Sequence, residues 1–412
     1  ERTRSVQVRA SMTRMQGAAI GRVASIGLFL ALGGCSVFRP QQPPAAPAAE
    51  AKPQLLPPLA THTFPFDPKA TGVVGELQVT FARQEDTIPD IARRFNLGFD
   101  EVARANPGVD VWLPGEGTRI LLPTQFVLPE APHEGVVVNV AALRLFYFPK
   151  PAEGEQRVVM TFPIGIGKVG WATPVGTTKV VSKRKDPWWT PPASVRKEHA
   201  EEGDPLPARV PPGPDNPLGA YAMNLGWTSY LIHGTNKPAG VGLRASHGCI
   251  RMYPEDIATV FDRIPVGTKV TVVNQPLVYR WQGDSLSVQA YPTHEDVDSR
   301  GKSKAKGKQV EPADEDEVAP PQLTDAVTNK MFQKVKPHGG AIDWPLTEQV
   351  VREAKGVAVP VSRRGTTLES FLAAARLVEN AVPAGATWDG QEAPADDDQP
   401  KPVADAGSRG GR

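Results

Sequence analysis

The feature that most constrains the fold is the spacing of short β-rich runs between residues 135 and 275. These runs are rich in β-branched and aromatic residues and are separated by Gly and Pro, which is typical of strands. They cover residues 136–140, 144–148, 158–166, 177–182, 230–233 and 269–273. One helix start is obvious, with Pro254 in the first turn and Glu255 and Asp256 near the positive end of the helix dipole. We therefore predict a mainly β domain with a short helix.

Residues 186–217, between two of these strands, contain nine prolines and the pair Trp188-Trp189. Proline removes a backbone donor and fixes φ, so a stretch this rich in proline does not continue a sheet. We predict a long irregular insertion, of the kind that often covers a site.

A smaller module is predicted at residues 76–124. Its elements are a strand at 77–81, a helix capped by Thr87 and Asp90, a helix at 100–105 and a strand at 118–122. This order, with the segments EDTIPDIARRF, ANPG and GTRILLP, resembles a LysM module, a family that binds peptidoglycan and related glycans. A small α+β packing domain without a ligand is the alternative, because Phe99 and Trp112 would suit a core equally well.

The first 35 residues have the layout of a secretory signal. Basic residues precede a mostly apolar run at 23–32, which is shorter than the roughly 20 helical residues that span a bilayer. The run ends Leu-Gly-Gly-Cys35, which resembles a bacterial lipobox, in which the cysteine is lipidated and anchors the protein. Ser36 follows, and by that resemblance it favours the outer membrane over the inner. A plain cleaved signal is the alternative.

Two further segments are predicted to lack a packed core. Residues 36–75 include a Pro/Ala-rich stretch, so we predict a linker there. Residues 293–412 begin with a basic block beside an acidic one, which predicts disorder. Residues 322–376 regain helical periodicity, so we predict a partly disordered extension with a few short helices and flexible termini.

Charge and cysteine content exclude two classes. The formal net charge is +1, which gives no support for a nucleic-acid partner. Only two cysteines occur, Cys35 and Cys249, and they lie in different contexts, so a disulfide framework is not predicted.

The segment 231–251, LIHGTNKPAGVGLRASHGCIR, holds two of the seven histidines and one of the two cysteines. A thiol with a pKa of about 8.5 is mostly protonated at neutral pH, and a nearby imidazole can take its proton to generate a thiolate nucleophile. We predict Cys249 as nucleophile and His233 as base, brought together by turns at the glycines. The backbone amides of residues 247–249 would then form an oxyanion hole.

Simpler interpretations of these residues stay open. A lone cysteine is usually a small buried hydrophobe, and a cysteine with two histidines can bind zinc. Zinc is disfavoured, because no fourth ligand is close and His247 and Cys249 are only two residues apart. We therefore predict no metal and no cofactor.

His233-Gly234-Thr235 followed by the run Ser246–Arg251 resembles the signature of the YkuD-type L,D-transpeptidase catalytic domain. The flanking segments IGIGKVGWATPVGTTKV, DPWWTPPASVRKEH and PPGPDNPLGAYAMNL are similar to the ErfK/YbiS subgroup. This resemblance implies a YkuD-type β-sandwich, with Cys249 acylated and His233 oriented by the Gly234 carbonyl. It implies further roles for His247 and Ser246 (shaping the loop), Gly248 (oxyanion binding), Arg251 (substrate carboxylate, or bracing the loop), and Trp188, Trp189 and Tyr221 (donor groove, or sheet packing).

The resemblance also implies a reaction. Cys249 would attack the carbonyl before the terminal D-Ala of a peptidoglycan tetrapeptide stem, release D-Ala and retain a thioester. A lysine of an outer-membrane lipoprotein would give a wall-anchored protein, another stem a 3–3 cross-link, and water would make the chain an L,D-carboxypeptidase. The ErfK/YbiS similarity favours anchoring. The expected location is the periplasm, lipid-anchored, with stem peptides and glycan as partners.

Two other functions compete. A non-enzymatic lipoprotein that tethers the membrane to peptidoglycan would explain the lipobox, the linker and residues 76–124, but not the pairing of His233 with Cys249. A cysteine endopeptidase is disfavoured, because its scattered Cys, His and Asn signature is absent.

Overall fold

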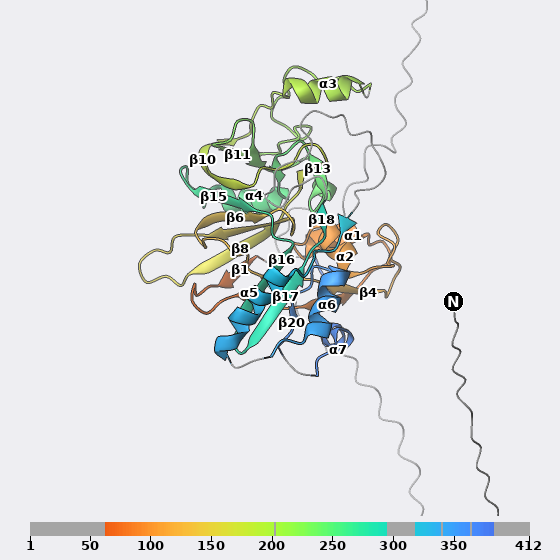
Figure 1. Cartoon of the computed structure of the whole chain (residues 1–412). Coiled ribbons are helices and arrows are strands. Elements are labelled where there is room, and N and C mark those ends of the chain that lie inside the picture. The colour runs from red at the N-terminus through yellow and green to blue at the C-terminus, as the bar shows by residue number, and fades with distance from the viewer. Residues whose placement is uncertain (1–61, 202, 295–317, 339–340, 363–364, 383–412) are drawn as a thin grey trace, which may run out of the picture. The chain divides into compact units, whose positions relative to one another are not determined.

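The computed structural model describes residues 62–201, 203–294, 318–338, 341–362 and 365–382. Its largest element is a nine-stranded mixed sheet (Figure 1). In spatial order the strands are β1 (Thr63–Pro65), β8 (Val158–Pro163), β7 (Arg144–Phe148), β6 (Gly135–Asn139), β15 (Lys269–Val273), β10 (Gly176–Lys185), β11 (Tyr221–Leu225), β12 (Leu231–His233) and β14 (Ile250–Arg251). The mainly β fold predicted from the sequence is confirmed.

The central strands are apolar on both faces, because both faces are covered. In β6, Val136 and Val138 point into one core and Val137 into another. In β7, Leu145 and Phe146 divide in the same way. Successive side chains of a strand point to opposite faces, so a strand buried on both sides reads as a continuous hydrophobic run. The first core also holds helix α4 (Pro254–Phe261), and the second holds the helices of the small module.

Helix α4 (Pro254–Phe261) begins as predicted, with proline in the first turn and Glu255 and Asp256 after it. Its residues Ile257 and Val260 are buried against the sheet. Near it, the parallel strands β9 (Ile166–Gly167) and β13 (Arg244–Ser246) and the 3-10 helix η1 (Pro238–Gly240) shape the segment that carries Cys249.

The insertion at 186–217 was predicted to be irregular. That prediction is wrong in part, because the insertion contains helix α3 (Ala193–Glu201). The helix begins directly after Pro191 and Pro192 and buries Val195. Alanine, arginine, lysine and glutamate favour a helix, and the prolines lie outside its bounds. The insertion therefore contains both a helix and proline-rich irregular flanks.

The small module has strands β3 (Gln78–Phe81) and β4 (Arg119–Leu122) and helices α1 (Ile88–Arg94) and α2 (Phe99–Ala105). The predicted capping box is present: the Thr87 amide donates to Asp90 Oδ2 over 2.8 Å, and the Asp90 amide donates to Thr87 Oγ1 over 3.3 Å. Short strands β2 (Val73–Gly75) and β5 (Gln125–Val127) flank it.

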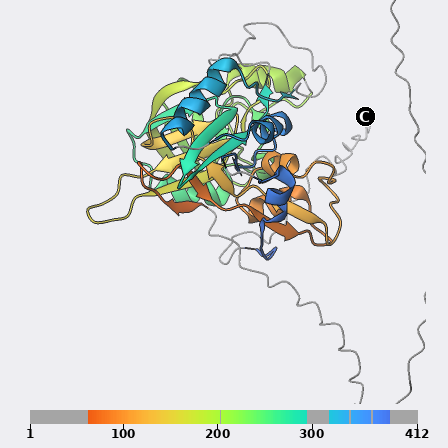
Figure 2. The same cartoon turned by 60° about the horizontal axis from the view of Figure 1, so that its bottom comes forward.

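A third group of elements lies in the C-terminal part of the chain. It comprises strands β16 (Leu277–Gln282), β17 (Ser285–Ala290) and β20 (Val359–Pro360), the pair β18 (Thr293–His294) and β19 (Val318–Ala319), strand β21 (Arg376–Leu377), helices α5 (Asp325–Val335), α6 (Trp344–Glu353) and α7 (Leu368–Ala373), and 3-10 helix η2 (Lys336–His338). Strand β21 pairs with β3 and so extends the sheet of the small module. Figure 2 shows the blue end of the described chain beside the orange module.

The structure revises parts of the predicted organisation. The linker interpretation does not hold for residues 62–75, because β1 joins the large sheet and β2 pairs with β5. The hairpin β16–β17 was not predicted. The signal sequence, Cys35 and most of the linker lie outside the described residues. In the part that the structure does describe, no helix has the length and apolarity needed to cross a bilayer.

Candidate active site

Strand pairing brings together the two segments that carry the predicted nucleophile and base. Strands β12 and β14 run parallel, with Ile232 opposite Ile250 and His233 opposite Arg251. Both isoleucines are buried in the core that holds α4. Side chains alternate along a strand, so His233 and Arg251 project from the other face. Cys249 lies two residues before Arg251, directly ahead of β14, and its sulfur accepts a backbone hydrogen bond from Leu231 of β12.

His233 is held as a neutral imidazole. Its Nδ1 lies 2.6 Å from the carbonyl oxygen of Gly234, and only 4% of the residue is exposed. Because a carbonyl can only accept, Nδ1 carries the hydrogen and Nε2 keeps its lone pair. Burial, reinforced by the charge of Arg251, lowers the pKa of His233 from 6.5 to about 3, against the opposing effect of the Gly234 carbonyl. The predicted orienting contact of Gly234 is therefore present.

Cys249 is half-buried, and its Sγ lies 3.6 Å from the Ser229 carbonyl oxygen. Burial raises the pKa of the Cys249 thiol, while a backbone hydrogen bond from Leu231 and the charge of Arg251 oppose that rise. With the thiol pKa raised and the imidazole pKa lowered, the resting pair is a thiol and a neutral imidazole rather than a thiolate and an imidazolium.

The loop before Cys249 is fixed by Ser246. Its hydroxyl donates to the Cys249 carbonyl over 2.6 Å and accepts from the Gly248 amide over 3.1 Å. Gly248 has a φ of +101°, and a Cβ there would lie 2.8 Å from Tyr230 Cε1. Only glycine fits this backbone and this close approach. The Gly248 amide, predicted to bind an oxyanion, is thus engaged by Ser246 in this structure.

His247 has partners that sequence reasoning missed. Its Nε2 lies 2.9 Å from Oε2 of Glu198, on helix α3, and Lys168 pairs with the other oxygen of that carboxylate. Trp171 meets the imidazole edge to face at a centroid distance of 4.9 Å. Burial lowers the pKa of His247, and Glu198 offsets part of that shift. Glu198 lies 49 residues from His247, and no local pattern indicates the contact.

The backbone and the side chain of Arg251 have different surroundings. Its backbone braces the loop, because it exchanges two 2.9 Å hydrogen bonds with Gly165. Its guanidinium lies near Cys249, and burial lowers its pKa while the Cys249 charge opposes the shift. Among the described residues, Nε of Arg251 is buried without a hydrogen-bond partner.

The three predicted groove aromatics differ in their placement. Tyr221 precedes Ala222, which pairs with His233, so it lies on the opposite face of the sheet, where its ring packs 4.9 Å from that of Phe261. It therefore does not line a groove with His233. Trp189 is half-buried and its backbone pairs with Val210, whereas Trp188 is 48% exposed.

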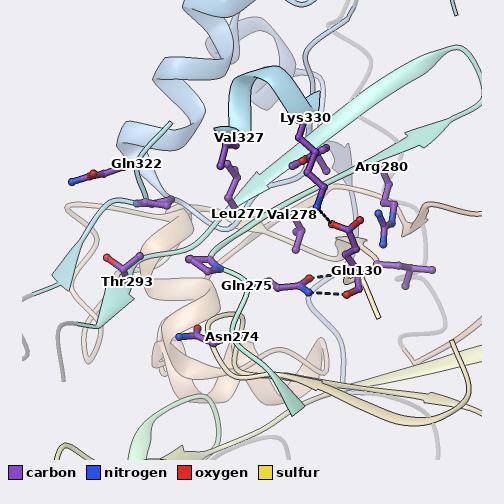
Figure 3. Close-up of a pocket in the computed structure, with 14 residues that line it drawn as sticks. Glu130, Asn274, Gln275, Leu277, Val278, Arg280, Thr293, Gln322, Val327 and Lys330 are labelled. Carbon is purple, nitrogen blue, oxygen red and sulfur yellow. Dashed lines mark hydrogen bonds and ion pairs between the residues drawn. The ribbon is translucent and has the colours of Figure 1, made fainter. Parts of the chain in front are cut away.

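Two further features lie outside this site. In the described part of the chain, no three His, Cys, Asp or Glu side chains cluster as metal ligands. A cavity of about 570 Å³ lies at the C-terminal elements, where Glu130 pairs with Lys330 (Figure 3). Its lining includes Arg280 and Gln275 but neither His233 nor Cys249, so it is separate from the thiol site.

Comparison with known proteins shows which family this architecture resembles. The family model of the YkuD L,D-transpeptidase catalytic domain matches residues 133–272. Probable L,D-transpeptidase YbiS of Escherichia coli K12 is 44% identical over 218 residues, which cover 52% of this chain and 70% of the relative. Probable L,D-transpeptidase ErfK/SrfK of the same strain is 42% identical over 225 residues, covering 54% and 71%.

Solved structures give a weaker likeness. The NMR structure of the catalytic domain from E. faecium L,D-transpeptidase is 24% identical, and the match covers 35% of this chain and 100% of that one with a TM-score of 0.26. The sequence relatives carry the assignment. The strands from β6 to β14 and the Cys249 loop fall within the matched region, and the relatives define the class of the protein as an L,D-transpeptidase. The chain belongs to the YkuD family of L,D-transpeptidases.

Proposed function

We propose that Cys249 forms a thioester with peptidoglycan tetrapeptide stems and transfers the acyl group to an amine. The observation that carries the proposal is the state of His233: it is neutral, it is oriented by the Gly234 carbonyl, and its strand β12 pairs with β14, which begins directly after Cys249. A neutral imidazole with a free lone pair on Nε2 is the form that a general base requires.

In the first half of the reaction, the Cys249 proton passes to His233 Nε2 as sulfur attacks the carbonyl before the terminal D-Ala. The tetrahedral oxyanion is stabilised by backbone amides at Cys249, with Gly248 contributing once its bond to Ser246 opens. The imidazolium then returns the proton to the departing D-Ala amine, and a thioester remains on Cys249.

In the second half, an acceptor amine attacks the thioester and gives its proton to His233, and the thiolate leaves and is reprotonated by it. A lipoprotein lysine gives a protein linked to peptidoglycan, and a stem-peptide amine gives a 3–3 cross-link. Of these acceptors we favour the lipoprotein lysine, as the resemblance of the flanking segments to the ErfK/YbiS subgroup implies. Water as acceptor would make the protein an L,D-carboxypeptidase.

Two residues are assigned to the substrate. The buried guanidinium of Arg251 would meet a substrate carboxylate, because it lies beside Cys249 and its Nε lacks a partner among the described residues. Trp188 would line the donor groove from the insertion, since it is exposed and carries Arg209 over its ring at 4.6 Å.

The rest of the chain would deliver the site to its substrate. We propose that residues 76–124 bind glycan as a LysM module and that lipidation at Cys35 anchors the protein on the periplasmic side of the outer membrane. The same two features fit a non-enzymatic tethering lipoprotein, which is the alternative.

The test uses residues 36–412 incubated with purified disaccharide-tetrapeptide, followed by intact-protein mass and product analysis. We expect D-Ala release and a mass increase at Cys249 that is absent in Cys249→Ala. Adding a lysine-containing lipoprotein peptide or a second stem separates anchoring from cross-linking and hydrolysis. A folded protein that binds sacculi but gives neither adduct nor D-Ala would favour the tethering lipoprotein.

A further inference from the structure

The carboxylate of Glu198 bridges the insertion and the loop that carries the nucleophile. Its Oε2 lies 2.9 Å from His247 Nε2, and its Oε1 pairs with Lys168. The side chains of Glu198 and His247 are 25% and 21% exposed. Because both are largely removed from water, this contact is stronger than an ordinary surface ion pair.

Both partners of Glu198 are themselves fixed to the nucleophile loop. The amide of Lys168 donates to the Ser246 carbonyl over 2.8 Å, and Gly167 pairs with Ser246 between β9 and β13. His247 lies between Ser246 and Gly248 in the chain. The Glu198 carboxylate on α3 therefore contacts two neighbouring segments at once, through Lys168 directly after β9 and His247 directly after β13.

We propose that Glu198 is a positioning residue for the acyl-transfer site. It fixes the ring and the tautomer of His247 and, through it, the conformation of the loop from Ser246 to Cys249. The inference rests on the proposed function of Cys249, which it extends to a residue of the insertion. Helix α3 thereby becomes part of the site rather than a cover that is independent of it.

The tautomer follows from the contact. A carboxylate only accepts, so His247 Nε2 carries the hydrogen, in the same way that a buried acid orients a catalytic imidazole. The groups that face this ring are Glu198, Lys168, His199 at a centroid distance of 6.2 Å, the edge of Trp171, and, by charge, Arg251. Glu198 supplies the only negative charge among them.

The experiment compares acylation rates of residues 36–412, by intact mass with disaccharide-tetrapeptide, across four proteins. Glu198→Ala should acylate up to about a hundredfold more slowly, the range expected when a catalytic group shifts by about 1 Å. Glu198→Gln should be intermediate, because its amide oxygen still accepts from His247 but cannot pair with Lys168 as an anion. Glu201→Ala, on the same helix and paired with Lys197 among the described residues, should match the wild type.

A second measurement tests positioning directly. Long-range proton–nitrogen NMR of the histidine rings should show hydrogen on His247 Nε2 in the wild type. In Glu198→Ala the tautomer should become mixed, and the pKa of His247 should fall, because the carboxylate raises it. Thermal melts of all variants report whether α3 remains folded.

The outcomes separate the two proposals. Wild-type acylation with an equally fast Glu198→Ala and an unchanged His247 tautomer would overturn the role of Glu198 alone. Absence of acylation in the wild type would overturn the proposed function, and the NMR comparison would then decide whether Glu198 positions His247.

Discussion

Polar groups are buried in two regions of this protein, and the structure treats them in opposite ways. At the interface between the small module and the large sheet, Arg144 of β7 is 0% exposed and Glu101 of α2 is 4% exposed, and they form hydrogen bonds of 2.8 and 3.1 Å. Nearby, Arg94 and Asp86 are 2% and 1% exposed and lie 2.5 Å apart. Here charge is buried in pairs.

The thiol site instead buries groups that are neutral or that lack an interaction partner. His233 is kept neutral, the Cys249 thiol has a raised pKa, and Arg251, unlike Arg144, has no carboxylate partner in the described part of the chain. A buried pair resists rearrangement, whereas a desolvated group without a partner can exchange its interaction with a substrate. Different polar clusters of one molecule therefore serve rigid packing and exchangeable contacts.

The largest predicted effect is on the paired region. Arg144→Met should lower the free energy of unfolding by about 3–5 kcal/mol, because Glu101 would stay buried without its partner. Urea denaturation measures this, with Lys269→Met as control, since the exposed pair of Lys269 with Glu134 should contribute about 0–1 kcal/mol. A loss below about 1 kcal/mol for Arg144→Met would show that the pair is not what holds the module.

The neutral histidine predicts a dependence of stability on pH. The pKa of His233 is about 3 in the folded protein against 6.5 for the free group, so the unfolded chain binds more protons between these values. Stability from this group is present above pH 6.5 and is lost as pH falls towards 3, by a few kcal/mol in total. Unfolding of the wild type and of His233→Gln, compared at pH 7 and pH 4.5, should show the larger acid loss in the wild type. Equal losses would mean that His233 already titrates near its ordinary pKa.

A smaller effect is expected where the C-terminal segment joins the paired region. The Asn380 side chain donates to Asp86 Oδ2 over 2.7 Å and accepts from Arg94 over 3.0 Å. Asn380→Ala should destabilise the protein by about 1–3 kcal/mol, the cost of leaving buried polar groups unsatisfied. Asn224→Ala, which removes an exposed bond to Ser182, is the matched control and should change stability by about 0.5 kcal/mol or less. If both variants behave alike, the C-terminal contact does not complete the cluster.

Local sequence patterns predicted the elements of the fold well. The strands at 144–148 and 269–273 were predicted with the bounds that the structure shows, because β-branched and aromatic runs between Gly and Pro are a local signal. The capping box of Thr87 and Asp90 is equally local. The hairpin β16–β17 also carried such a signal, the turn Gly283-Asp284 between alternating runs, and it was overlooked.

Contacts between distant segments could not be predicted in this way. His247 meets Glu198 across 49 residues, and Asn380 meets Arg94 across 286. Nothing in the sequence near either residue specifies its partner, because the pairing depends on how sheets and helices pack. The motif indicated His233 and Cys249, but the groups that position the loop and the face on which Tyr221 lies came only from the structure.

Arg251 offers the smallest change in stability and the sharpest contrast with Arg144. The same substitution, Arg251→Met, removes a buried cation that, unlike Arg144 with Glu101, has no carboxylate partner among the described residues, so the free energy of unfolding should change by about 1 kcal/mol or less. Its charge holds down the pKa of the Cys249 thiol, so that pKa should rise and alkylation of Cys249 by iodoacetamide should shift to higher pH. Following the alkylation rate between pH 7 and 10 in both proteins measures the shift. An unchanged profile with a large loss of stability would mean that Arg251 braces the loop as Arg144 braces the module, and the contrast between the two regions would fail.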